Sequence, residues 1–258
     1  MLPFLPDRKR PLLFAHRGCS SLAPENTMAS FRKAQEIGAP GIELDIHVTK
    51  DGKLAVAHDD NFKRTANDER AIEDMGYDEI KAIDTGSYFS PAFKGEHPPL
   101  MEDVLEAFCP AMYIDIELKT GKTKDDPLPG LLAELLKKFD EKVSASVTVS
   151  SFNPFAVKAF KKLCPRVPTA VIYCVDKEVP FILRRGFGRI ISGCDYLKPI
   201  HKLVTPFTRF RFSTIEKRPM VPWTIDDRTI AEKMLALGCA GIISNKPQDM
   251  LNLVKKYG

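Results

Sequence analysis

Eight short apolar runs rich in β-branched residues recur along the chain, and helical patterns separate most of them. The runs span residues 12–15, 41–48, 112–118, 146–151, 169–174, 194–197, 220–225 and 240–244. The helical patterns span 27–37, 101–108, 128–139, 154–163, 179–185, 227–237 and 247–256. Strands that alternate with helices form parallel sheets, and a count of eight favours a closed barrel over an open sheet. We therefore predict an α/β fold, a (β/α)8 TIM barrel, with an open sheet as the alternative because the crossover at 199–218 is short.

The spacing between the second and third runs is too long for a simple crossover. Turn signals such as Asp51-Gly52 and Pro98-Pro99 interrupt it. We predict a short hairpin partner at 54–57, a small insert at about 59–99, and then the crossover helix at 101–108. Inserts that follow barrel strands gather at the C-terminal mouth, where the active sites of barrels lie.

The length and composition suit one large, soluble globular domain. A chain of 258 residues matches a single barrel domain over 1–258, and its net charge of only +4 comes from scattered cations. Nucleic acid is therefore not expected as a partner, and no apolar stretch reaches the roughly 18 residues of a membrane span. The six cysteines are far apart and form no CxxC pair, so we expect reduced thiols and a cytoplasmic protein of unknown oligomeric state.

Two acidic residues interrupt the second apolar run. Glu43 and Asp45 are two positions apart, so both side chains lie on the same face of a strand. Two carboxylates that point together into a barrel repel each other and resist desolvation unless a cation compensates them. A shared divalent metal is the simplest compensation, and charges that face water from an edge strand are the alternative.

The third run repeats this pattern. Asp115, Glu117 and Lys119 share one face of the strand. The carboxylate of Glu117 would complete an oxygen-rich site for a hard cation such as Mg²⁺ or Ca²⁺. Lys119 would neutralise a phosphate oxygen, or alternatively would form an ion pair with Glu117.

Two histidines follow strands near these acids. His16 ends the first run and His58 follows the hairpin partner, so both imidazoles would face one mouth of the barrel. Imidazoles titrate near neutral pH and suit general acid and base roles, although a histidine at a strand end often only makes structural hydrogen bonds. Arg17 offers a donor fork for phosphate, and Asn26 is the expected N-cap of the first helix.

Taken in order, these motifs resemble a known family. His16-Arg17-Gly18, Pro24-Glu25-Asn26-Thr27, Glu43-Leu44-Asp45, His58-Asp59 and Glu117-Leu118-Lys119 look like the signature of the glycerophosphodiester phosphodiesterase family. Ser151-Phe152, Trp223-Thr224-Ile225 and the stretch 241–247 are further matches, so the resemblance covers almost the whole chain.

The resemblance implies a barrel with an insert after the second strand, and it also implies roles. Glu43, Asp45 and Glu117 would hold one divalent cation. His16 and His58 would act as general acid and base in an order that the sequence leaves open. The remaining expected contacts with the substrate are Arg17 and Lys119 at the phosphate and Trp223 in the pocket.

Two positions depart from the family pattern. Ala240 stands where members often carry Asp, and Asn245 stands where they often carry an acid. Both positions fall outside the expected metal and histidine set, so we expect the reaction type to be kept and the polarity of the mouth to differ.

The predicted function is metal-dependent hydrolysis of a small-molecule glycerophosphodiester to an alcohol and glycerol 3-phosphate. The attacking group is water, or a substrate hydroxyl through a cyclic phosphate. One rival is a lysophospholipase D-like enzyme that acts on acylated diesters. Another is a barrel that binds a phosphorylated metabolite without catalysis, and the intact histidines and carboxylates argue against it.

Overall fold

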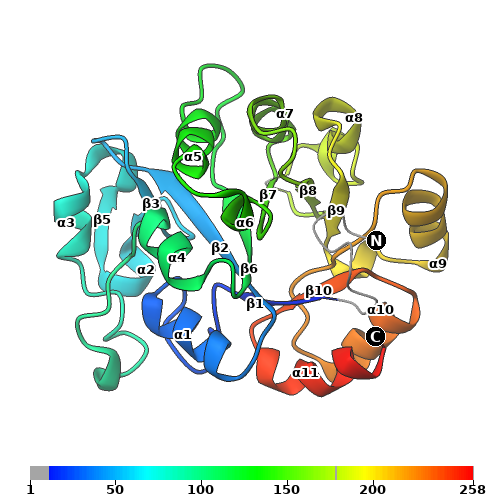
Figure 1. Ribbon diagram of the computed structural model, residues 1–258, viewed down its shortest axis with the longest axis horizontal. Helices are drawn as coiled ribbons and strands as arrows, with labels where there is room; N and C mark the ends of the chain where they lie inside the picture. The colour runs from blue at the N-terminus through cyan, green and yellow to red at the C-terminus, as the bar shows by residue number, and fades with distance from the viewer. Residues whose placement is uncertain (1–11, 178, 258) are drawn as a thin grey trace.

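In the computed structural model, which describes residues 12–177 and 179–257, the strands lie inside an arc of helices (Figure 1). The strands are β1 (Leu12–His16), β2 (Gly41–Val48), β3 (Leu54–Val56), β4 (Asn61–Phe62), β5 (Asp68–Ala71), β6 (Tyr113–Leu118), β7 (Val147–Ser151), β8 (Thr169–Tyr173), β9 (Tyr196–Pro199) and β10 (Gly241–Ser244). The α-helices are α1 (Met28–Glu36), α2 (Lys63–Ala66), α3 (Tyr77–Lys81), α4 (Met101–Phe108), α5 (Leu128–Lys137), α6 (Glu141–Ser144), α7 (Pro154–Leu163), α8 (Gly188–Ser192), α9 (Pro206–Arg209), α10 (Arg228–Ala236) and α11 (Pro247–Lys256). None of these helices combines the length and the apolar character that crossing a bilayer requires.

The large sheet is parallel and curls around an axis. Its strand order is β10-β1-β2-β6-β7-β8-β9, every neighbouring pair on this path is parallel, and β3 adds to β2 as an antiparallel hairpin partner. Parallel strands bring all their carboxyl ends to one mouth, so the loops after β1, β2, β6, β7, β8 and β10 meet there.

The segment 219–225 fills the gap between β9 and β10. The amides of Val221 and Trp223 donate to carbonyls of β9, and the amides of Ala240 and Ile243 donate to Met220 and Pro222. Pro219 and Pro222 have no N–H to donate and take part only through their carbonyls, which accept from the amides of Leu197 and Ile243, and isolated bridges join the segment to β9 and the residue after it. The predicted strand at 220–225 therefore occupies its expected place with an incomplete hydrogen-bond pattern.

The other seven predicted strands correspond to β1, β2, β6, β7, β8, β9 and β10, and most of the predicted helices also form. The helix predicted at 179–185 is wrong. A single 3₁₀ turn (Phe181–Leu183) forms there, and α8 begins only at Gly188. Pro180 precedes the turn and Gly186 follows it with a φ of 77°, so the chain turns out of the helical path twice within seven residues.

The segment between β3 and α4 forms a lobe beside the mouth (Figure 1). Its two-stranded sheet, β4 with β5, and helix α3 enclose a small apolar cluster that includes Phe62, Ile72, Tyr77 and Ile80. The crossover helix that follows, α4, has the predicted bounds.

Both faces of β2 are buried, which determines where its acids lie. Ile42, Leu44 and Ile46 point outward into the main apolar cluster, where side chains of α1, α4 and α5 cover them. Since side chains alternate along a strand, Glu43 and Asp45 must point into the barrel. The packing of the apolar side chains outside the sheet thus fixes the inward direction of the two acidic side chains.

Candidate active site

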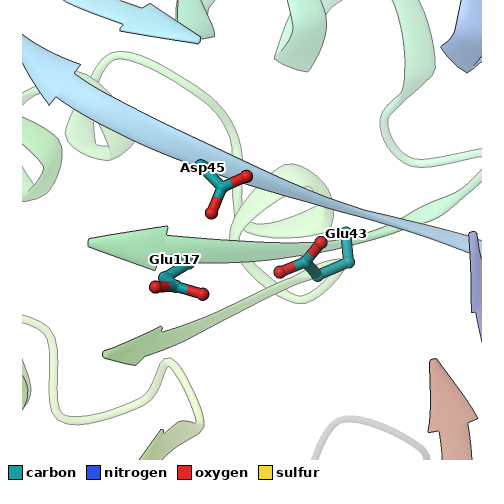
Figure 2. A group of neighbouring side chains, drawn as sticks. All are labelled: Glu43, Asp45 and Glu117. Carbon is teal, nitrogen blue, oxygen red and sulfur yellow. The ribbon is translucent and has the colours of Figure 1, made fainter. Parts of the chain in front are cut away.

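Three carboxylates from β2 and β6 converge inside the barrel. The strand register aligns Asp45 with Glu117 and Glu43 with Asp115, in two successive rows. Figure 2 shows Glu43, Asp45 and Glu117 gathered around one space, and one oxygen from each lies within 4.8 Å of the others. Their exposed fractions are only 2%, 1% and 7%. Such a buried, all-oxygen group suits one hard divalent cation.

The fourth acid, Asp115, has a different partner. Its Oδ2 lies 2.8 Å from the ammonium of Lys198, which is itself only 1% exposed. Lys198 also donates to the hydroxyl of Ser150 at 2.9 Å and lies 3.7 Å from Glu43. Asp115 is therefore neutralised by a protein cation, whereas the other three acids surround a space that a metal would fill.

The sequence prediction missed Lys198. It is the lone charged residue of β9, and it comes directly after the apolar run predicted as a strand at 194–197. A single cation inside an otherwise apolar strand was the available signal. Its acidic partner lies on a strand three positions away in the sheet, and only the barrel brings the two together.

The electrostatics of the group are unbalanced without a cation. Burial raises the pKa of Glu43 well above its usual value, and the neighbouring carboxylates raise it further against the opposing effect of Lys198. Burial also raises the pKa of Glu117, against Lys119. Asp45 differs, because Lys119 and Arg17 outweigh its burial and lower its pKa to about 2. The pocket therefore favours protons on two of its acids, which a metal ion would replace.

Two cations border the carboxylates at the mouth. The ammonium of Lys119 lies 3.2 Å from Glu117 and 3.8 Å from Asp45. The Nε of Arg17 lies 3.6 Å from Asp45, while its Nη1 donates to Glu25 at 3.0 Å. Both side chains line the same cavity as Glu43 and Glu117, so both lie beside the space where an anionic ligand would bind.

The backbone around Arg17 depends on a glycine. Arg17 and Gly18 both have positive φ, of 55° and 82°, at the turn that follows β1. A Cβ on Gly18 would lie 2.3 Å from the hydroxyl oxygen of Ser30, so no larger residue fits without displacing α1. This close approach lets the carbonyl of Arg17 accept hydrogen bonds from Ser30 and Asn26.

His16 is oriented by a short chain of hydrogen bonds. Asp226 accepts from the Asn245 amide nitrogen at 2.7 Å, and the amide oxygen of Asn245 lies 2.6 Å from Nδ1 of His16. The carboxylate fixes which end of the amide faces the ring, so Nδ1 must donate and Nε2 is left as an acceptor, 3.8 Å from Glu43. Burial lowers the pKa of His16 to about 4, and Arg17 adds to this effect.

Asn245 therefore contacts one of the two predicted catalytic histidines. This differs from the expectation that the residue lies apart from the metal ligands and the histidines. Residues 16 and 245 are distant in the sequence but adjacent in space, because β1 pairs with β10. An amide at this position orients the ring without adding a negative charge.

His58 lies two residues after β3, the antiparallel partner of β2. The amide of Ala57 donates to the carbonyl of Asp45 at 3.0 Å, which ties this segment to the acidic strand. Nδ1 of His58 lies 2.7 Å from Asp59, so Nε2 is the ring nitrogen left free for the cavity. Arg64 then joins Asp59 to Glu25 at 2.8 Å and 2.7 Å and links the two histidine loops.

One local expectation is corrected. The N-cap of α1 is Thr27, not Asn26, because Ser30 at the third helical position completes a capping box with Thr27. Asn26 instead has a φ of 54° and donates its amide to Asp45 at 3.0 Å. The neighbouring Glu25 is paired with Arg17 and Arg64.

One cavity of about 840 Å³ collects most of the predicted site residues. Its lining includes His16, Arg17, Glu43, His58, Glu117, Lys119 and Trp223. Asp45 is buried behind it. The indole N–H of Trp223 donates to the carbonyl of Lys198 at 2.9 Å, so the ring is fixed beside the cavity.

Solved structures identify the class of fold. A phosphodiesterase of Oleispira antarctica, solved in complex with the product sn-glycerol-3-phosphate, matches with a TM-score of 0.84 at 24% identity, over 95% of this chain and 97% of that one. The predicted (β/α)8 barrel is confirmed at the level of the fold.

Sequence relatives identify the family. The family model described as "Glycerophosphoryl diester phosphodiesterase family" matches residues 16–249. A glycerophosphodiester phosphodiesterase of Caldanaerobacter subterraneus subsp. tengcongensis is 34% identical over 96% of this chain and 100% of its own length. One of Bacillus altitudinis is 32% identical over 91% of this chain and 94% of its own length. The chain belongs to the glycerophosphoryl diester phosphodiesterase family and is a phosphoric diester hydrolase.

Replacing Lys198 by Met should destabilise the protein strongly, because it leaves the buried Asp115 without its cation. We expect the free energy of unfolding in urea to fall by about 3–5 kcal/mol. The double variant Lys198→Met with Asp115→Asn should recover part of this loss, since no unpaired charge remains. A single variant as stable as the parent protein would contradict the assigned pair.

Proposed function

We propose that the protein hydrolyses glycerophosphodiesters to an alcohol and glycerol 3-phosphate, and that it requires one divalent cation held by Glu43, Asp45 and Glu117. The observation that carries this proposal is the convergence of three buried carboxylates at the barrel mouth. The names of the two sequence relatives support the substrate class, and the product bound to the Oleispira antarctica enzyme supports the glycerol phosphate product.

The donor set suits Mg²⁺ or Ca²⁺, because both prefer carboxylate oxygens. When bound, such a cation would polarise a phosphate oxygen and, together with Lys119 and Arg17, offset the charge of the three acids. Arg17 and Lys119 are proposed to contact the remaining phosphate oxygens and to stabilise the negative charge that builds in the transition state. Trp223 is proposed to line the substrate pocket.

The two histidines are proposed to transfer the protons. A water molecule attacks phosphorus and loses a proton to one imidazole, the bond from phosphorus to the leaving oxygen breaks, and the other imidazole protonates that oxygen. The fixed tautomer of His16, with Nε2 free to accept, supports the base role for His16. His58, beside Asp59, would then serve as the acid.

Two further proposals concern the whole chain. We propose a single barrel domain over residues 1–258, with the lobe at about 59–99 as its insert. We also propose a cytoplasmic location, which the six unpaired cysteines support because thiols persist in reducing compartments.

Activity should disappear on exhaustive chelation and return with Mg²⁺ or Ca²⁺. Because the raised pKa of Glu43 means that the cation must displace protons, metal affinity measured by calorimetry should increase as pH rises. Glu117→Gln should weaken metal binding at least about tenfold, whereas the surface variant Glu102→Gln should not. Full turnover in the metal-free protein would remove the cation from the mechanism.

His16→Ala and His58→Ala should each lower kcat about 100-fold or more on glycerophosphoethanolamine. A diester with a p-nitrophenolate leaving group needs little protonation, so the variant that lacks the acid should recover most of its rate on it. We expect this recovery for His58→Ala and not for His16→Ala, with His97→Ala as the matched control. Recovery in His16→Ala instead would reverse the two roles.

A further inference from the structure

Exposed apolar side chains gather on one flank of the barrel, on the side of α8 and α9 that lies away from the inserted lobe (Figure 1). Of thirteen large apolar side chains exposed in the described part of the chain, ten lie between residues 155 and 215. Six of these, which we call the apolar flank, are 50% to 85% exposed: Phe181, Phe187, Ile190, Phe207, Phe210 and Ile215. None of the six lines the cavity with the proposed catalytic residues, so that cavity does not account for their exposure.

Helical spacing arranges the apolar flank in two strips. Phe187 and Ile190 are three residues apart at the start of α8, so they lie on one side of it. Phe207 and Phe210 are likewise three residues apart at α9. Ile215 follows five residues later, at the end of a π-helix (Phe210–Ile215) whose i→i+5 bonding brings it to the same side.

A cluster of charges around Glu216 joins the two strips. Arg189 of α8 lies 2.7 Å from Glu216, and its guanidinium carbon lies 4.7 Å from the ring centroid of Phe212, which is buried beneath the π-helix. Glu216 also pairs with Arg211 at 3.3 Å and with Arg218 at 3.1 Å. Three guanidinium groups thus meet one carboxylate, so the apolar flank is one fixed surface with a surplus of positive charge.

The positive charge of the chain is concentrated around this flank. Residues 151–220 contain 14 Lys and Arg against 4 Asp and Glu, a net charge of +10, whereas the remainder contains 24 against 30, a net charge of −6. Arg185, Lys202 and Lys217 are exposed next to the flank residues in the sequence, and none has an ion pair within residues 12–177 and 179–257. These cations are therefore available to an anionic partner.

Apolar side chains among free cations match the surface of an anionic membrane. There, Phe and Ile side chains enter the boundary between headgroups and acyl chains, while Lys and Arg lie at the negative headgroups. A second copy of the chain would bring two positive surfaces together, which is unfavourable. Nucleic acid would use the cations and aromatic rings but would gain nothing from the isoleucines.

We infer that the apolar flank docks the protein peripherally on a bilayer that contains anionic phospholipids. This role does not depend on the proposed hydrolysis, because it uses side chains outside the active-site cavity.

The test measures sedimentation of the full chain with vesicles of phosphatidylcholine, either pure or with roughly one third phosphatidylserine. A chelator is present, so that metal-dependent binding in the active site does not contribute. We expect binding to the anionic vesicles only, and weaker binding as NaCl rises from about 0.1 M to about 1 M, because salt screens exposed charges. Equal binding to both kinds of vesicle would contradict the inference.

Variants locate the surface that binds. The double variant Phe207→Ser with Phe210→Ser should weaken binding to the anionic vesicles about tenfold or more, because two rings lose apolar contact. Lys202→Gln should weaken it about fivefold. The matched controls Phe89→Ser and Lys94→Gln change an exposed phenylalanine and an exposed lysine of the inserted lobe and should bind as the parent protein does. Every changed side chain is exposed, and unchanged thermal unfolding midpoints would confirm that the variants fold.

The remaining outcomes separate the inference from its rivals and from the proposed function. Unchanged binding in the double variant, or equal losses in the controls, would overturn the inference. A dimer in sedimentation velocity that the double variant abolishes, without vesicle binding, would assign the apolar flank to a second copy and also overturn it. Vesicle binding by a protein that, supplied with metal, does not hydrolyse glycerophosphoethanolamine would overturn the proposed function alone.

Discussion

The mutual repulsion of buried carboxylates is the constraint around which this barrel is arranged. Glu43, Asp45 and Glu117 come within 4.8 Å of one another in a place that water hardly reaches. Charges so close and so desolvated are stable only with compensating cations or protons. Lys198 compensates Asp115 deeper in the barrel, and Lys119 and Arg17 lie at the mouth. The space between these side chains is where we propose that the divalent metal binds.

The parallel barrel allows distant segments to share this constraint. Different loops at the mouth carry different side chains of the proposed active site, and hydrogen bonds between neighbouring loops hold these side chains in place. Asp226 and Asn245 fix the ring of His16 from the β10 side, and Arg64 in the inserted lobe connects Asp59 with Glu25 from the other. The protein thus sets the position and tautomer of its proposed catalytic groups before any substrate arrives.

The sequence predicted what depends on local periodicity. Alternation of strands and helices gave the barrel, and the spacing of two between Glu43 and Asp45 gave the inward acidic face. It did not predict the ion pair of Lys198 with Asp115 or the contact of Asn245 with His16. In each case the two residues are far apart in the chain, and only the folded barrel brings them together. The segment 219–225 closes the sheet without forming a regular strand, since Pro219 and Pro222 lack the N–H donors of a full ladder, an effect that periodicity does not reveal.

The central claim is that one cation binds to three named carboxylates. Anomalous diffraction from crystals grown with Mn²⁺, which has the oxygen preference of Mg²⁺, tests it most directly. We predict a single strong peak within about 2.0–2.5 Å of an oxygen from each of Glu43, Asp45 and Glu117, with Asp115 still paired to Lys198. A peak elsewhere, or no peak at saturating Mn²⁺, would contradict it.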